Sequence, residues 1–158
     1  MIGSSSALPW AHYRFVKDVA PLDSSHGIHL HNLAIAELLF DARNAYLTEG
    51  IGVTWEGLLR SGQNLVMRRL EIDFEHEVRG GIPLKVGVRA TTRTRRTITF
   101  EEAVWRVDPP VLIAAARSVH LLVLADTPGA IDLPDDVVAR FEAFEGQPLT
   151  LRPHHVSR

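Results

Sequence analysis

A stretch without glycine or proline, from about Leu33 to Glu49, constrains the fold more than any other part of this sequence. Asn32 belongs to the residue types that often cap helices, and Gly50 is a typical C-terminal stop. We therefore expect one helix about 25 Å long, at 1.5 Å per residue. Most of its side chains are apolar, and a thin polar stripe runs through Glu37, Asp41, Asn44 and Thr48. Such a helix must be buried on most sides.

The second half of the chain supplies strands that could cover this helix. Apolar and polar residues alternate there with a period of two, which is typical of half-buried strands. The expected strands are 13–19, 65–74, 84–95, 98–107 and 111–124, and a short helix is expected from Pro134 to Phe144. The strand at 111–124 is the most continuously apolar, so we expect it to be covered on both faces. The pattern predicts an α+β fold, with an antiparallel sheet of about five strands wrapped around one central helix.

Length and composition narrow the function classes. A chain of 158 residues predicts a single domain, with 1–9 and 147–158 as loose termini. The net charge of -2 gives no general field for nucleic acid or an anionic membrane. The chain has no cysteine, which excludes disulfides, thiolate nucleophiles and cysteine-ligated zinc. The sequence shows no secretory signal and no apolar run near the roughly 18 residues that span a bilayer, so we expect a cytoplasmic protein.

Several short motifs follow one another in a fixed order. His29-Leu30-His31-Asn32 precedes Glu37 and then Phe40-Asp41-Ala42-Arg43, and further motifs lie at 69–74, 95–101 and 116–119. Together they resemble the 4-hydroxybenzoyl-CoA thioesterase family of hotdog-fold proteins, whose signature is GHVNN…E…F(E/D)AR. The resemblance covers about residues 12 to 145. It implies a hotdog fold, hydrolysis of an acyl-CoA thioester without a cofactor, and a homo-oligomer, dimer or tetramer, with sheets paired edge to edge and active sites between subunits.

Asp23 is the first candidate for the chemistry, because a carboxylate before the helix could act as a general base or a nucleophile. A loop-capping turn is the structural alternative. The family pattern is D-x-D-x-x-G-H-V-N-N, with catalysis generally assigned to the second aspartate. Counting back from His29 places Asp23 on the first aspartate and Ser25 on the second, and Gly27 lies one place early. Either the loop shifts so that Asp23 acts, or the activity is altered or absent.

The helix N-terminus is the second candidate, because its first N–H groups are unpaired and the dipole is positive there. In the resembling family this end polarises the thioester carbonyl, which would make Asn32 part of the site. A plain N-cap is the alternative. His29 and His31 could orient the substrate or exchange a proton.

Two other readings of the same loop are weaker. His26, His29 and His31 lack the spacing of a known zinc site, so no metal is expected. Ser24 and Ser25 beside His26 suggest a serine hydrolase, but no G-x-S-x-G elbow is present.

Outside the loop, three groups of charged residues need a role. Arg93, Arg95 and Arg96 could hold the phosphates of coenzyme A or form a solvated strand end. Glu37 and Asp41 on a buried helix would need partners, and Arg43 could supply one. Residues 75–77 are expected to be surface loop.

The leading hypothesis is an acyl-CoA thioesterase that works at the N-terminus of the central helix. One alternative is a non-catalytic acyl-CoA-binding or regulatory hotdog protein that has lost the acid at Ser25. Another is a hydratase or dehydratase, which is disfavoured because the sequence shows no clear pair of a histidine and an acid. The acyl group cannot be assigned from the sequence.

Overall fold

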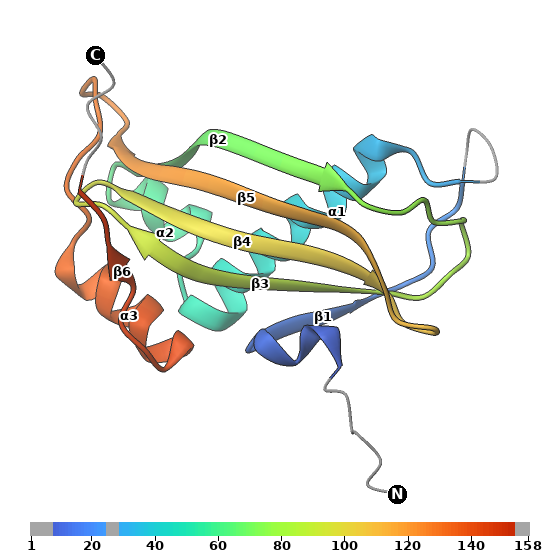
Figure 1. Cartoon of the computed structure of the whole chain (residues 1–158). Helices are drawn as coiled ribbons and strands as arrows, with labels where there is room; N and C mark the ends of the chain where they lie inside the picture. The colour runs from blue at the N-terminus through green and yellow to red at the C-terminus, as the bar shows by residue number, and fades with distance from the viewer. Residues whose placement is uncertain (1–7, 25–28, 154–158) are drawn as a thin grey trace, which may run out of the picture.

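The computed structural model describes residues 8–24 and 29–153 and shows a curved antiparallel sheet around one central helix, α1 (Asn32–Ala45) (Figure 1). The main strands lie in the order β1-β3-β4-β5-β2. Their bounds are β1 Phe15–Val19, β2 Gln63–Phe74, β3 Leu84–Arg93, β4 Thr97–Arg106 and β5 Val111–Leu124. A short sixth strand, β6 (Thr150–Leu151), pairs in parallel with β3. The predicted α+β hotdog architecture is confirmed.

The remaining elements are short. They are a 3₁₀ helix η1 (Pro9–His12), a π-helix η2 (Tyr46–Ile51), α2 (Trp55–Arg60) and α3 (Asp135–Glu145). Within the described residues, no helix combines the length and the apolar character needed to cross a membrane.

Both expected ends of the central helix were wrong by one or two residues. His31 is the N-cap rather than Asn32, because its backbone is extended (φ -70°, ψ 147°) and its Nδ1 accepts the N–H of Leu33 at 3.2 Å. At the other end the chain continues through Gly50 and stops at Gly52, whose φ of 75° is left-handed. Gly50 has a packing role instead, since a Cβ there would lie 3.2 Å from the ring of Phe144.

In the single chain α1 is buried on one side only, which corrects the expectation that it is covered on most sides. Ile35, Leu39 and Ala42 face the sheet and are buried. Leu33 is 72% exposed and Phe40 is 49% exposed, so an apolar part of the helix surface faces solvent. The same holds for β5, which is covered on the helix side, whereas its opposite side carries the exposed Arg117.

The centre of the core is Tyr46, just after the end of α1. Its ring is fully buried and contacts Phe15, Phe100 and Phe144 edge-on, with centroids 5.4–5.9 Å apart. The hydroxyl donates to Glu145 Oε1 at 2.6 Å. Burial, and then the Glu145 carboxylate, raise the pKa of Tyr46, so the phenol stays protonated as a donor.

The outer edge of β3 is closed by three separate pieces of the chain. β1 pairs with residues 84–88 of β3, and β6 pairs with residues 92–93. Between them, Glu145 Oε1 accepts the backbone N–H of Ala90 at 2.9 Å. Leu149 is buried beside this edge. The expectation of a loose tail is therefore wrong for 147–153, and 154–158 lie outside the described residues.

Candidate functional site

The N-terminal end of α1 lies between two cavities that share His29, Leu30 and Asn32. The first, of about 250 Å³, is also lined by Asp23, Ser24, His31 and Ala34. The second, of about 290 Å³, is also lined by Ile35, Phe74, Glu75, His76, Glu77, Val78 and Ile113. The start of the helix therefore lies against open space on two sides.

Two segments that are far apart in the sequence fix this end of the helix. His29 forms a β-bridge with Arg79, and the N–H of Leu30 donates to Val78 O at 2.8 Å. This short pairing attaches the start of the helix to the loop that follows β2. It brings residues 74–78 to the site.

Asp23 is exposed and lines the first cavity together with Asn32. Its loop packs against residues 80–81. The N–H of Gly81 donates to Leu22 O at 2.8 Å, and a Cβ at Gly80 would lie 2.7 Å from Ser24 N. Gly80 is therefore required for close backbone contact with this loop. Ser25, His26 and Gly27 lie outside the described residues, so the predicted role of Ser25 stays a prediction.

His31 has a structural role at the start of the helix, because its Nδ1 accepts the N–H of Leu33 at 3.2 Å. Its predicted part in substrate binding stays a prediction. Asn32 follows this cap and lines both cavities, at the positive end of a 14-residue helix. This end keeps the properties of an anion site.

Glu77 lies in an exposed loop, as expected for residues 75–77, and the structure pairs it with His29. His29 Nδ1 lies 3.5 Å from Glu77 Oε2, and both side chains are solvent-accessible. Sequence reasoning found no pair of a histidine and an acid because these residues are 48 positions apart. The only signal would have been that a strand ends just before residue 75.

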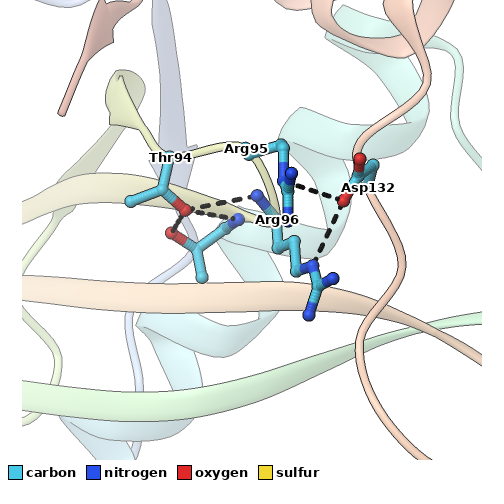
Figure 2. A network of polar contacts seen from close by, with 5 residues as sticks. Thr94, Arg95, Arg96 and Asp132 are labelled. Atoms are coloured by element: carbon cyan, nitrogen blue, oxygen red, sulfur yellow. Dashed lines mark hydrogen bonds and ion pairs between the residues drawn. The ribbon is translucent and has the colours of Figure 1, made fainter. Parts of the chain in front are cut away.

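The arginine cluster lies at the opposite end of the sheet. Arg95 Nε and Arg96 Nε both contact Asp132 Oδ1, at 3.2 Å and 3.1 Å (Figure 2). Strand β5 runs from one place to the other: Ile113 lines the second cavity, and Leu121 pairs with Thr97, the residue after Arg96. At 3.3 Å per residue, these two positions of β5 are roughly 26 Å apart. Within one chain the structure brings together Asp23, His29, His31 and Asn32, but not the arginines.

The third arginine, Arg93, lies in the last position of β3, and its Nε is buried without a hydrogen-bond partner among the described residues. Its backbone O accepts the N–H of Arg152, which anchors the C-terminal strand.

A buried polar cluster links α1 to the middle of the sheet. Arg43 Nη2 donates to Glu102 Oε2 at 2.9 Å, and Arg43 Nε donates to Glu102 Oε1. Ser118 Oγ donates to Glu102 Oε1 at 3.1 Å, and His120 Nε2 lies 3.2 Å from Ser118 Oγ. Burial, and then the Arg43 charge, lower the pKa of His120 to about 3, so its imidazole is neutral at physiological pH.

This cluster corrects the expected pairing of Arg43. Its partner is Glu102 on the sheet, whereas Glu37 and Asp41 lie on the exposed side of the helix and are solvated. A carboxylate and a guanidinium that are both buried satisfy each other's hydrogen bonds here. The cluster therefore holds the helix on the sheet.

Comparison with known proteins supplies further findings. Residues 19–141 match the family model described as the Thioesterase-like superfamily. No curated protein sequence matches the chain.

Solved structures match with the same architecture. A 1,4-dihydroxy-2-naphthoyl-CoA thioesterase from Synechocystis has 15% identity and a TM-score of 0.73, covering 80% of this chain and 94% of that one. A thioesterase from Thermus thermophilus, complexed with coenzyme A and Zn, has 23% identity and a TM-score of 0.72, covering 88% and 99%. A Staphylococcus aureus protein in complex with CoA has 12% identity and a TM-score of 0.76, covering 91% and 94%. At these identities the likeness concerns the fold.

Proposed function

The chain belongs to the thioesterase-like superfamily, and we propose that it hydrolyses an acyl-CoA thioester at the N-terminus of α1. One observation carries the proposal: the Asp23 carboxylate and the start of α1 line the same cavity of about 250 Å³. A base and a positive helix end on one cavity are the two elements that hydrolysis of a thioester requires. Coenzyme A in two of the similar structures supports the substrate class.

The proposed mechanism uses three parts of the site. The carbonyl oxygen of the thioester lies at the positive end of α1 beside the N–H of Asn32, which stabilises the negative charge that develops there. Asp23 accepts a proton from a water molecule whose oxygen attacks the carbonyl carbon. The C–S bond then breaks, the carboxylic acid forms, and the proton passes to the coenzyme A thiolate. His29, which lines both cavities, orients the bound thioester.

We further propose that a second copy of the chain completes the site. β2 is an edge strand, and three apolar side chains on its helix side are 41–45% exposed: Met67, Leu70 and Phe74. Leu33 and Phe40 of α1 are exposed as well, and we propose that a second copy covers these apolar side chains.

This pairing gives the arginines a role. When two β2 strands pair antiparallel, the C-terminal end of β2 in one copy lies beside the N-terminal end of β2 in the other. The end of the second sheet that carries the arginines therefore lies on the same side as the first copy's helix N-terminus. The partner's Arg93, Arg95 and Arg96 would then be available for the phosphates of coenzyme A.

The test is thiol release from a panel of short, medium, long and aromatic acyl-CoAs. Turnover by the wild type that is lost in Asp23→Asn supports the mechanism. Wild-type rates in Asp23→Asn exclude Asp23 as the base, and no turnover with any acyl-CoA excludes the activity.

A second candidate function is a non-catalytic acyl-CoA binder, which Ser25 favours because it occupies the usual acid position of the resembling family. Tight binding of acyl-CoA without turnover would select it. Ser25→Asp separates the alternatives further: kcat/KM rises if position 25 faces the substrate, and falls if Asp23 does, because two neighbouring acids cannot both ionise easily.

A further inference from the structure

His76 lines the second cavity at the start of α1, and its ring has a defined tautomer. Its Nδ1 lies 2.9 Å from the backbone oxygen of Leu112, and a carbonyl oxygen can only accept a hydrogen bond. In the neutral ring Nδ1 therefore carries the hydrogen, and the lone pair is on Nε2. A histidine oriented by a backbone carbonyl in this way is arranged to take up a proton at its other nitrogen. The proposed hydrolysis does not use this group.

The segment that carries His76 is attached both to β5 and to the start of α1. The backbone N–H groups of Glu75 and His76 donate to Ile113 O, at 2.8 Å and 3.2 Å. Val78 is buried, and its backbone oxygen accepts the N–H of Leu30, two residues before the helix. These contacts fix the position of His76 relative to the helix N-terminus.

The two cavities at this helix end differ in their walls. Beyond the residues that both share, the first is lined mainly by polar side chains, those of Asp23, Ser24 and His31. The second has an apolar wall made of Ile35, Phe74, Val78 and Ile113. A thioester carbonyl carries a sulfur on one side and the acyl carbons on the other. With the carbonyl at the start of α1, the apolar wall suits the acyl carbons, and His76 lies on their side.

The second cavity also contains a pair that the linear sequence does not show. The absence of a clear pair of a histidine and an acid disfavours a hydratase, but in the folded chain His29 Nδ1 lies 3.5 Å from Glu77 Oε2. Both side chains line the same cavity as His76. Two imidazoles and a carboxylate are groups that transfer protons in general acid–base catalysis.

We propose that the second cavity hydrates 2-enoyl thioesters of coenzyme A, with His76 as the general base. The proposal rests on the proposed function in one respect, since both reactions need the thioester carbonyl at the N-terminus of α1. The two reactions differ in the base, in the cavity and in the carbon that water attacks.

The reaction adds one water molecule across the double bond. His76 Nε2 takes a proton from water, and the water oxygen forms a bond to Cβ. The electron pair of the Cα=Cβ bond moves towards the carbonyl, whose oxygen becomes negative. The positive end of α1 stabilises this enolate oxygen. His76 then returns its proton to Cα, and the product is the 3-hydroxyacyl thioester.

The test follows two rates on one substrate, but-2-enoyl-CoA. Mass spectrometry measures formation of the 3-hydroxybutanoyl group, as thioester or free acid, and thiol release measures hydrolysis. The wild type should form the hydroxylated product faster than a solution without protein. The ratio of hydration to hydrolysis then separates the two cavities in the variants.

His76→Asn keeps a side-chain N–H that can donate to Leu112 O but removes the base. The ratio of hydration to hydrolysis should therefore fall by a factor of about 10²–10⁴. Asp23→Asn acts in the other cavity and should raise the ratio. His12→Gln, at an exposed histidine on η1, is the matched control and should keep both wild-type rates.

His76→Gly provides a readout that a purely structural role would not change. Added imidazole can occupy the space of the missing ring and supply the base, so hydration should return as the imidazole concentration rises. No hydration by the wild type, a wild-type ratio in His76→Asn, or no rescue of His76→Gly would overturn the proposal.

The two proposals for this helix end can fail separately. Thiol release without hydration overturns the hydratase alone and leaves the hydrolysis in place. Hydration without thiol release supports the hydratase and excludes the hydrolysis of this substrate. The absence of both reactions overturns the placement of the carbonyl at the start of α1, and with it the hydratase.

Discussion

Polar residues lie both at the N-terminal end of α1 and about 16 Å further along the same helix. The first group is open to solvent and is called the wet end, whereas the second is buried and is called the dry cluster. At the first, Asp23 and His29 are solvent-accessible and line open cavities. At the second, Arg43 is 4% exposed and Glu102 is 1% exposed, and their charges are fully paired.

The difference shows how one helix serves two purposes. Polar groups in the dry cluster have given up water and depend on one another, so the loss of one leaves another buried and unsatisfied. Polar groups at the wet end are hydrated and bear little of the folding energy. They are free to bind a substrate. Substitutions should therefore affect stability at one place and activity at the other.

The largest effect is expected from Glu102→Ala, because it leaves the Arg43 guanidinium buried without its counter-ion. The free energy of unfolding should fall by about 3–5 kcal/mol. Urea unfolding followed by circular dichroism measures it. Glu49→Ala removes an exposed pair with Lys17 and is the control, with a loss below about 1 kcal/mol. Equal losses in the two variants would contradict the contrast between dry and wet clusters.

Asp23→Asn tests the wet end. If Asp23 is the general base, kcat/KM for the best acyl-CoA should fall by a factor of about 10²–10⁴, while the urea midpoint stays at the wild-type value. Asp126→Asn, an exposed acid at the other end of β5, should change neither quantity. A lower urea midpoint in Asp23→Asn would show that this carboxylate also stabilises the fold. The wet end would then contribute to stability as well as to activity, against the contrast drawn here.

His120 gives the dry cluster a defined response to acid. Its pKa in the folded state is lowered to about 3, below the ordinary value of 6.5, so the unfolded chain binds a proton that the folded one does not. This contribution to stability is complete above pH 6.5 and is lost as the pH falls towards 3, at about 1.4 kcal/mol per pH unit. Unfolding of wild type and His120→Gln at pH 7, 5.5 and 4.5 should show a smaller loss in the variant. The exposed His12→Gln should follow the wild type, and parallel curves for all three proteins would refute the assignment.

The smallest effect on stability is expected at Asp132, which is 55% exposed and shared by Arg95 and Arg96. Asp132→Asn should change the free energy of unfolding by less than about 1 kcal/mol. It also releases both guanidinium groups, so KM for acyl-CoA should fall a few-fold if they bind the coenzyme A phosphates. Steady-state kinetics measure this change. If KM is unchanged in both Asp132→Asn and Arg96→Ala, the arginines do not bind the substrate.

Local patterns predicted much of the fold. Periodicity located the central helix and the main strands to within a few residues, because apolar spacing directly reflects which face is buried. It failed at Tyr13, which was expected in the first strand but precedes β1 and packs over Gly87 on the sheet face that points away from α1. Residue-type preference failed at the helix cap: it favoured Asn32, whereas His31 has the extended backbone of an N-cap and accepts the N–H of Leu33.

The candidate site was harder to predict, because its partners are distant in the sequence. The loop with Asp23, His29 and Asn32 follows from local chemistry and from the family resemblance. Glu77 beside His29, and Glu102 beside Arg43, depend on how the sheet folds back on the helix. No spacing in the linear sequence encodes such pairs.

The three-piece closure of the β3 edge has a consequence for biosynthesis. Glu145 and β6 are translated after all the main strands, so a nascent chain that already contains β5 still presents the N–H of Ala90 and the end of β3 unpaired. Open strand edges of this kind are where incomplete chains associate with one another. A chaperone that holds the emerging chain until α3 and β6 have left the ribosome would therefore increase the yield of native protein.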